Sequence, residues 1–269
     1  MKKITLLMLG FMLWFGFSVN AANLYLVANN GTQWTSTPTG FTNVYKVNLS
    51  TCNAGGAASL NEFLTDRTLA TPTYSVTVVT GSGNPKLATG DQIWVAGGTY
   101  NVSTPYVYNA TLNIYGGFAG TETVTTSRAK GSNTWNFSNE TIINGSTYTS
   151  GTAAIFTATG DRTGAIVDGM TFTACPTVPA VWIRAAIIRY CKFTSNTFTA
   201  LSLTTASAVT ATCTDCYFSG NSAPVSSSNA ACINANQTGG TATITNCVFE
   251  NNSNADTTTG ATAGVKVLG

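Results

Sequence analysis

Three short stretches of this 269-residue chain follow one pattern: CKFTSN over Cys191–Asn196, CYFSGN over Cys216–Asn221 and CVFENN over Cys247–Asn252. In each stretch Phe stands two residues after the Cys, and Asn stands five residues after it. A looser copy, MTFTAC, covers Met170–Cys175. Because recurrence at a spacing of about 20–50 residues is typical of repeat architectures, this motif is the first guide to the fold.

The positions before the motif recur as well. Three residues before it stands a β-branched residue or Cys, and five residues before it stands Ala. These positions hold Val167, Ile188, Cys213 and Ile244, and Ala165, Ala186, Ala211 and Ala242. Side chains two residues apart share one face of a strand, so each copy predicts a strand that buries these two positions. The first motif position and the Phe are again two residues apart, so they form a second pair on one face. A corner between the two pairs would let both face the same interior.

The spacing between copies is unequal: successive Phe residues from Phe172 to Phe249 are 21, 25 and 31 residues apart. The additional residues follow the Asn, so short strands can keep their register while one loop varies in length. Three short strands per turn around one interior predict a right-handed parallel β-helix, in which like residues stack in columns. A β-sandwich and a β-propeller are the alternatives, but both pair their strands antiparallel.

The repeat continues more loosely toward the N-terminus. The stretch DQIWVAGGTY, which begins at Asp91, places Ile93 and Tyr100 in slots equivalent to those of Val167 and Phe172. The stretch TIINGSTY over 141–148 predicts Ile143 in the slot of Val167 and Tyr148 in the Phe slot. Residues 91–269 are therefore predicted to form the β-helix, as about seven coils and a truncated last coil.

Two further segments precede the repeat. Residues 1–22 combine a basic start, an apolar stretch and small residues at Ala21 and Ala22, which is typical of a secretory signal peptide; a membrane anchor is the alternative. Residues 23–90 do not repeat and are predicted to form an N-terminal cap over the open end of the β-helix. Ser59 and Glu62 form a capping-box pattern there, which predicts a short helix.

Charge and composition exclude several functions. The chain has 12 Lys and Arg, 10 Asp and Glu, and no His. Loss of Lys2 and Lys3 with the signal peptide leaves 10 basic and 10 acidic residues, so the processed chain is formally neutral. Without a basic stripe, nucleic acid and anionic membranes are poor partners. The lack of His excludes serine triads, His-zinc sites and every other mechanism that depends on His.

The candidate catalytic residues are Asp161, Asp168, Arg184 and Arg189. One interpretation is a cluster that contacts carbohydrate or resembles a lyase site. The other is structural: Asp168 and Arg189 occupy the same corner slot in adjacent coils, so they should stack as a salt bridge of little energetic value. Glu122 and Arg128 similarly look like a pair that pins a loop. The structural interpretation predicts no catalytic residue, no cofactor and no metal.

The cysteines and the Asn column are also given structural roles. The chain has seven Cys, and the CTDC stretch at 213–216 has the spacing of a zinc knuckle or a redox motif. Each repeat Cys nevertheless occupies an ordinary core slot, so mostly free, buried thiols are predicted. Asn196 and Asn221 are predicted to hydrogen-bond along the stack as an Asn ladder and to adopt the left-handed backbone of the corners.

The stretches GDQIWVAGGTYN, YGGFAGTET and TIINGS, which begin at Gly90, Tyr115 and Thr141, resemble the opening coils of secreted pectin-lyase-like β-helix proteins of Gram-negative bacteria. The Phe-x-x-Asn repeats resemble those of bacterial polymorphic outer-membrane proteins. The resemblance covers roughly residues 85–269. The resemblance implies a β-helix fold and secretion. Many proteins with this fold cleave acidic polysaccharides, but a shared fold does not by itself assign a function.

Together these features predict a non-catalytic β-helix, secreted or on the cell surface or outer membrane, with an adhesion, display or structural role. Its variable loops would contact surface glycans or host and neighbouring proteins. A carbohydrate-active β-helix, acting as polysaccharide lyase, glycoside hydrolase or carbohydrate-binding module, is the alternative, and a phage-type spike is a third. No membrane span is expected after cleavage of residues 1–22. The final stretch, GVKVLG, ends one strand into a coil, which predicts a further C-terminal domain or a partner.

Overall fold

The computed structural model describes residues 23–29, 33–49, 60, 63–64, 75–81, 87–102, 104–108, 110–148, 153–158, 160–205, 209–223, 230–237, 239–255 and 262–268. The expected signal peptide, residues 1–22, lies outside the described residues. So does most of the variable loops after Asn221 and Asn252, at 224–229 and 256–261. Within the described part the chain is built from strands and one short 3-10 helix, η1 (Thr125–Ser127).

The strands form three larger sheets, here called A, B and C, and a two-stranded sheet of β18 (Ser222–Ala223) and β22 (Ser253–Asn254). Sheet A consists, in spatial order, of β20 (Thr241–Thr245), β16 (Thr210–Thr214), β13 (Ile187–Arg189), β10 (Ile166–Asp168), β7 (Asn113–Phe118), β4 (Gln92–Ala96), β1 (Leu24–Ala28), β2 (Val44–Asn48) and β3 (Ser75–Thr80). Sheet B consists of β21 (Val248–Glu250), β17 (Tyr217–Ser219), β14 (Lys192–Thr194), β11 (Met170–Thr173), β8 (Thr141–Asn144) and β5 (Gly98–Asn101). Sheet C consists of β23 (Val265–Leu268), β19 (Ile233–Gln237), β15 (Leu201–Thr205), β12 (Val181–Arg184), β9 (Phe156–Ala158) and β6 (Tyr106–Tyr108).

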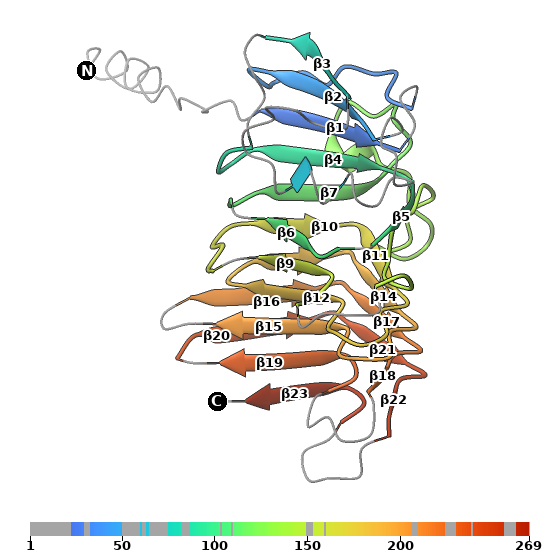
Figure 1. The fold of residues 1–269 in the computed structure, drawn as a ribbon, viewed down its shortest axis with the longest axis vertical. Helices are drawn as coiled ribbons and strands as arrows, with labels where there is room; N and C mark the ends of the chain where they lie inside the picture. Colours follow the sequence, from blue (N-terminus) through green and yellow to red (C-terminus); the bar gives the residue numbers. More distant parts are fainter. Residues whose placement is uncertain are drawn as a thin grey trace, which may run out of the picture.

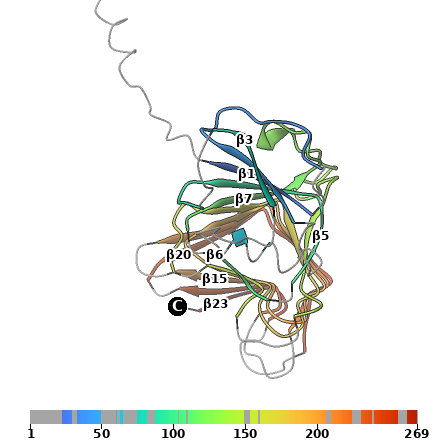
Figure 2. The ribbon, with the colours of Figure 1, turned by 45° about the horizontal axis from the view of Figure 1, so that its top comes forward.

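From β4 to β23 the chain visits sheets A, B and C in a fixed order. The successive triplets are β4–β5–β6, β7–β8–β9, β10–β11–β12, β13–β14–β15, β16–β17–β19 and β20–β21–β23. Each strand pairs in parallel with the equivalent strand of the next triplet, so the triplets lie one below another from β4 to β23 (Figure 1). The tilted view of Figure 2 shows the sheets arranged around the interior, where side chains from all three meet in one hydrophobic core. The all-β, parallel-sheet class expected from the repeat is confirmed.

The register of the four clearest repeats agrees with the sequence alignment. Phe172, Phe193, Phe218 and Phe249 are successive partners across sheet B, and their rings stack at centroid distances of 5.3, 4.7 and 5.0 Å. The three earlier rings of this column are fully buried, whereas Phe249 is 37% exposed. Val167, Ile188, Cys213 and Ile244 form the corresponding column of sheet A. A period-two pattern with one buried face therefore fixed the register.

Two assignments in the stretch at 141–148 were wrong, because Ile143 and not Tyr148 occupies the Phe slot there. Ile143 pairs with Phe172 and with Tyr100, so it belongs to the Phe column of sheet B and not to the slot of Val167. Ile114 of β7 is the partner of Val167 instead. The error arose because residues 119–140 are inserted between β7 and β8, which removes the usual spacing between a sheet A strand and its sheet B successor.

The corners use left-handed backbone at two recurring positions. The residue before each motif and the residue before each Asn slot have positive φ. These residues are Gly169, Tyr190, Asp215 and Asn246 before the motif, and Ala174, Ser195, Gly220 and Asn251 before the Asn slot. The expectation that Asn196 and Asn221 themselves take this conformation is therefore wrong. For residues other than glycine, this backbone costs about 1–2 kcal/mol each, a cost that the stacking of the neighbouring columns offsets.

The predicted Asn ladder is confirmed. Asn196 Nδ2 donates to Asn221 Oδ1 at 2.8 Å, and Asn221 Nδ2 donates to Asn252 Oδ1 at 3.0 Å. Each side-chain oxygen also accepts the backbone N–H of the Asn in the preceding coil. Each amide nitrogen also donates to the backbone carbonyl of the Phe in the preceding coil. Asn196 and Asn221 are fully buried, so these bonds satisfy polar groups that water does not reach.

The described part of residues 23–90 extends sheet A beyond β4. β1 pairs in parallel with β4 and β2, and β3 pairs antiparallel with β2. Side chains of Tyr25, Tyr45 and Phe63 join the common core. The backbone of Leu60, Phe63 and Leu64 is helical, but Ser59 and Glu62 lie outside the described residues and no helix is delimited in this segment, so the short helix stays a prediction.

A second apolar cluster covers the outer face of sheet A near β1, β4 and β7. Trp34 lies against Phe118 at a ring distance of 5.4 Å, and Trp94 stacks on Phe118 at 4.8 Å. Trp34 Nε1 donates to the carbonyl of Val27 at 3.0 Å. Backbone bonds from Thr35 and Ser36 to Gly120 join this segment to the insertion after β7. The outer layer thus places residues 119–140 beside the corner between sheets A and B.

Candidate functional site

The charged corner lies between sheets A and B and consists of Asp168, Arg189 and Arg128. Asp168 ends β10 and is the register partner of Arg189, which ends β13. Arg189 Nε donates to Asp168 Oδ2 at 2.7 Å, so the stacking of this pair expected from the repeat is confirmed. Asp168 is fully buried, whereas the side chain of Arg189 is 34% exposed.

Arg128 is a second cation on the same carboxylate, and the sequence did not indicate it. Its Nη2 lies 2.9 Å from Asp168 Oδ1 as an ion pair, without the alignment of a hydrogen bond. Its side chain is 4% exposed, and it donates to the carbonyls of Gly116 and Thr125, each at 2.7 Å. The guanidinium also lies over the rings of Phe137, Phe118 and Tyr115, at 4.6–5.7 Å from their centroids.

The backbone at Gly169 makes room for this arrangement. Gly169 has φ of +71°, and a Cβ at this position would lie 2.6 Å from Arg128 Nη1. A side chain there would therefore displace the guanidinium from Asp168. The corner turn and the ion pair depend on the same residue.

The charged corner has the character of a structural ion cluster. Both oxygens of Asp168 face arginine side chains, so the carboxylate is already engaged in two ion pairs. Its burial also keeps it out of reach of a polymer. These ion pairs attach the segment around Arg128 to the ends of β10 and β13.

Asp161 and Arg184 form a separate pair. Arg184 Nε lies 3.1 Å from Asp161 Oδ1, and both side chains are about one-third exposed. Asp161 lies between β9 and β10, and Arg184 ends β12 of sheet C, whereas Asp168 and Arg189 end β10 and β13 of sheet A. A strand of sheet A separates Asp161 from Asp168 and Arg184 from Arg189, so the two pairs lie at opposite ends of β10 and β13. The four candidate residues do not converge on one cleft.

Glu122 and Arg128 both pin the loop after β7, but not by pairing with each other as expected. Glu122 is buried, and its carboxylate accepts the backbone N–H groups of Ala119, Gly120 and Thr121 at 2.8–3.0 Å. Arg128 instead pairs with Asp168. The pairing of Glu122 with Arg128 was predicted from their closeness in the sequence. It is wrong because the partner of Arg128 comes from β10, a strand of the next triplet.

The outer platform is a group of side chains on the outer face of sheet B. Four are half-buried and the last is exposed: Trp135, Lys192, Tyr217, Glu140 and Glu250. Lys192 and Tyr217 are register partners on β14 and β17. The ring of Tyr217 stacks on Trp135 at 5.6 Å with an interplanar angle of 7°. Glu140 pairs with Lys192 and accepts from Thr171 Oγ1 at 2.7 Å. Tyr217 donates its hydroxyl to Glu250, and this hydrogen bond raises the pKa of Tyr217.

The cysteines within the described part of the chain are free, as the repeat predicted. They are Cys175, Cys191, Cys213, Cys216, Cys232 and Cys247; Cys52 lies outside the described residues. Desolvation raises the pKa of Cys232 to about 12. The described residues contain no group of three or more His, Cys, Asp and Glu side chains placed to bind a metal ion, so the zinc interpretation of CTDC gains no support.

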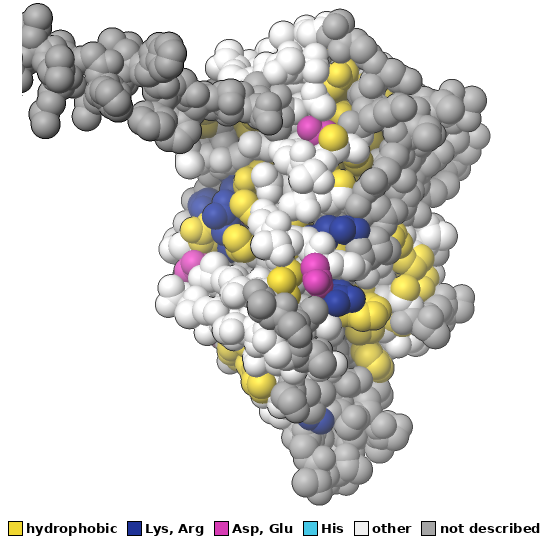
Figure 3. All heavy atoms as spheres, turned by 90° about the vertical axis from the view of Figure 1, so that its left-hand side faces the viewer, with side chains coloured by type: hydrophobic (Ala, Val, Ile, Leu, Met, Phe, Trp, Pro, Cys, Tyr) yellow, Lys and Arg dark blue, Asp and Glu magenta, His cyan; other side chains and the backbone are white. Residues whose placement is uncertain are grey.

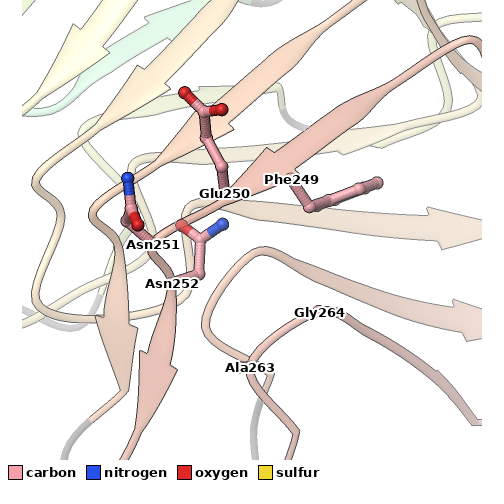
Figure 4. A pocket seen from close by; sticks show the side chains of 6 residues that line it. All are labelled: Phe249, Glu250, Asn251, Asn252, Ala263 and Gly264. Carbon is pink, nitrogen blue, oxygen red and sulfur yellow. The ribbon is translucent and has the colours of Figure 1, made fainter.

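A hollow of about 190 Å³ lies beside the last strands, lined by Phe249, Glu250, Asn251, Asn252, Ala263 and Gly264. Figure 4 shows Phe249 and Glu250 pointing to different sides of β21, with Ala263 and Gly264 facing them from the segment before β23. A single carboxylate and two amides offer neither a base paired with an acid nor a basic group for a polyanion. The hollow lies at the end of the core, beside the last ring of the Phe column.

Charged side chains are sparse on the face drawn in Figure 3. Lys and Arg form separate patches there, and the described atoms of this face form no continuous stripe of either charge. In the part of the chain that the structure describes, no helix has the length and apolar character needed to cross a membrane.

Comparison with known proteins gave no relative from which a function could be transferred. The chain matched no family model, no curated protein and no solved structure.

Proposed function

We propose that the chain is a right-handed parallel β-helix that acts as a non-catalytic scaffold, secreted or held at the cell surface, in adhesion or display. The strand order supports the solenoid: consecutive triplets visit the same three sheets, and equivalent strands pair in register. The right hand follows the general preference of parallel crossover connections. The character of residues 1–22 supports export, and the long loops after Asn221 and Asn252 offer variable contact surfaces.

The observation that carries the non-catalytic role is the engagement of the candidate acid and base groups in the architecture. Asp168 is buried between two arginines, and Asp161 forms its own pair at the other end of the strands. A hydrolase or lyase needs a base, an acid or metal, and charge stabilisation in one cleft. Thr, Ser and Asn, which dominate the remaining polar positions, bind by hydrogen bonds but are poor acid–base groups.

We expect the purified chain to release no unsaturated or reducing sugar from pectate, alginate or similar polymers, with or without calcium. The measurement is absorbance of unsaturated products together with a reducing-end assay. Product release that disappears in Arg189→Ala, while circular dichroism shows the variant folded, would contradict the non-catalytic role. Arg189 is preferred to Asp168 for this purpose because its side chain is partly exposed and its loss leaves Arg128 on Asp168.

The outer platform favours a second candidate function, carbohydrate binding. Stacked aromatic rings flanked by carboxylates and an ammonium group offer a flat apolar surface and hydrogen bonds, which suit a sugar ring. This surface is on sheet B, away from the charged groups at the start of β10.

If the outer platform binds glycans, Trp135→Ala should weaken binding on a glycan panel by about 5- to 30-fold, because an aromatic anchor contributes on the order of 1–2 kcal/mol. Trp182→Ala is the matched control, since Trp182 is also an exposed tryptophan but lies on sheet C, where it donates to Thr204. Equal losses in both variants, or unchanged binding in both, would remove the outer platform as a binding site.

A further inference from the structure

Four of the free cysteines meet on the inner side of the corner between sheets A and B. Cys191, Cys216 and Cys247 stand directly before β14, β17 and β21, and Cys213 lies within β16. Cys191, Cys213 and Cys216 are fully buried. Cys247 belongs to the last triplet and is partly exposed. The four thiols thus share one environment but differ in their access to solvent.

Cys213 and Cys247 are in sulfur contact. Their Sγ atoms lie 3.7 Å apart, and Cys247 Sγ is also 3.8 Å from the carbonyl oxygen of Cys213. The register partner of Cys213 is Ile244, so Cys247 reaches this sulfur diagonally from the following corner. A disulfide requires about 2.05 Å between the sulfurs, so the two sulfurs must approach further by rotation about their Cα–Cβ bonds.

The surroundings also make Cys247 the reactive member of the pair. Hydrogen bonding with the thiols of Cys213 and Cys216 lowers the pKa of Cys247. Desolvation by burial raises the pKa of Cys175 and Cys232, and that of Cys216 as well. The thiolate is the nucleophile in thiol–disulfide exchange, so a partly exposed thiol with a lowered pKa reacts before buried thiols do.

We propose that Cys247 and Cys213 are a reactive dithiol that small disulfides oxidise to an intramolecular disulfide. The Cys247 thiolate attacks one sulfur of the small disulfide, breaks its S–S bond, and forms a mixed disulfide while the other half leaves as a thiolate. Cys213 then loses its proton and attacks the Cys247 sulfur, which forms the Cys213–Cys247 bond and releases the second half. The protein loses two electrons and two protons, and the small disulfide gains them as two thiols.

The proposed bond links β16 to the start of β21, in neighbouring triplets. It would link the last triplet covalently to the triplet before it. This modification site is independent of the adhesion or glycan-binding role.

The test is oxidation of the full chain by oxidised glutathione at neutral pH, followed by trapping of free thiols with a maleimide and mass analysis. Cys52 is replaced by Ser in every variant, so that it does not obscure the six described thiols. We expect loss of two hydrogen atoms without a stable glutathione adduct. Asp-N followed by chymotrypsin, which cut before Asp215 and after Phe218, separates the peptides of Cys213, Cys216 and Cys247.

Variants assign the two roles. Cys213→Val keeps the core filled, because Val167 occupies the same column, and it should trap one stable glutathione on Cys247. Cys247→Ala should give neither adduct nor disulfide, and Cys232→Ala should behave like the parent chain. In the absence of oxidant, Cys247 should react with the maleimide at least about tenfold faster than any other described thiol.

A Cys216–Cys247 link, an unchanged disulfide in Cys213→Val, or faster labelling of another described thiol would overturn the proposal. So would recovery of all six thiols free after oxidation, provided that circular dichroism shows the chain folded.

Discussion

Replacing Phe193 by alanine is expected to lower the free energy of unfolding by about 3–5 kcal/mol, the range found when an aromatic core site is emptied. Phe193 is fully buried and stacks between Phe172 at 5.3 Å and Phe218 at 4.7 Å. Its removal leaves a cavity with a ring on each side, and the register of sheet B prevents the neighbouring strands from closing it. Chemical denaturation followed by circular dichroism measures the loss.

Phe249→Ala is the matched control for this column. Phe249 occupies the same slot but is 37% exposed and stacks on one ring, that of Phe218. The expected loss is about 1–2 kcal/mol, because less apolar surface is returned to water and no closed cavity forms. Equal losses for Phe193→Ala and Phe249→Ala would contradict the stacked Phe column and the partial exposure of its last ring.

Asp168→Asn is expected to lower the free energy of unfolding by about 3–5 kcal/mol, the usual cost of leaving a buried charge without its partner. Arg189 can turn toward water when the carboxylate is lost, but Arg128 cannot, since its side chain is 4% exposed and enclosed by aromatic rings. The substitution keeps the size of the side chain, so the effect reports on charge. Thermal and denaturant unfolding measure it.

Asp161→Asn provides the comparison within the same set of candidate residues. Its pair with Arg184 is partly exposed, so the expected loss is under about 1 kcal/mol. Adding Arg128→Met to Asp168→Asn should recover part of the stability, because the unpaired guanidinium is removed along with its partner. A loss near 1 kcal/mol for Asp168→Asn, or no recovery in the double variant, would show that Arg128 finds other compensation.

Much of the fold could be read from the repeat because its information is local. A side-chain period of two, with one buried face, specifies which residues stack and in which register. This reasoning placed Phe172, Phe193 and Phe218 correctly, and it anticipated both the Asn ladder and the Asp168–Arg189 pair. It failed at Ile143, where the insertion after β7 changed the spacing, and at Asn196 and Asn221, where the left-handed residue is the one before.

The sequence predicted less of the candidate site than of the fold. The sequence pointed to four charged residues, and the structure separates them into two pairs at opposite strand ends. Trp135 stacks on Tyr217 and Glu140 pairs with Lys192 across the outer face of sheet B, although no motif connects these residues. The contact of Cys213 with Cys247 runs diagonally between slots, so an alignment by columns does not show it.

The sequence by itself determined the strand class, the stacked columns and the corner pair of Asp168 with Arg189, because each of these depends on neighbours at a fixed period along the chain. Only the tertiary structure decided that Arg128 joins that pair, that Trp34 covers Trp94 and Phe118, and that Cys247 meets Cys213. The physical reason is that these contacts are made by inserted segments and diagonal approaches. Their geometry follows from how whole strands and loops pack, and it leaves no periodic pattern in the residues themselves.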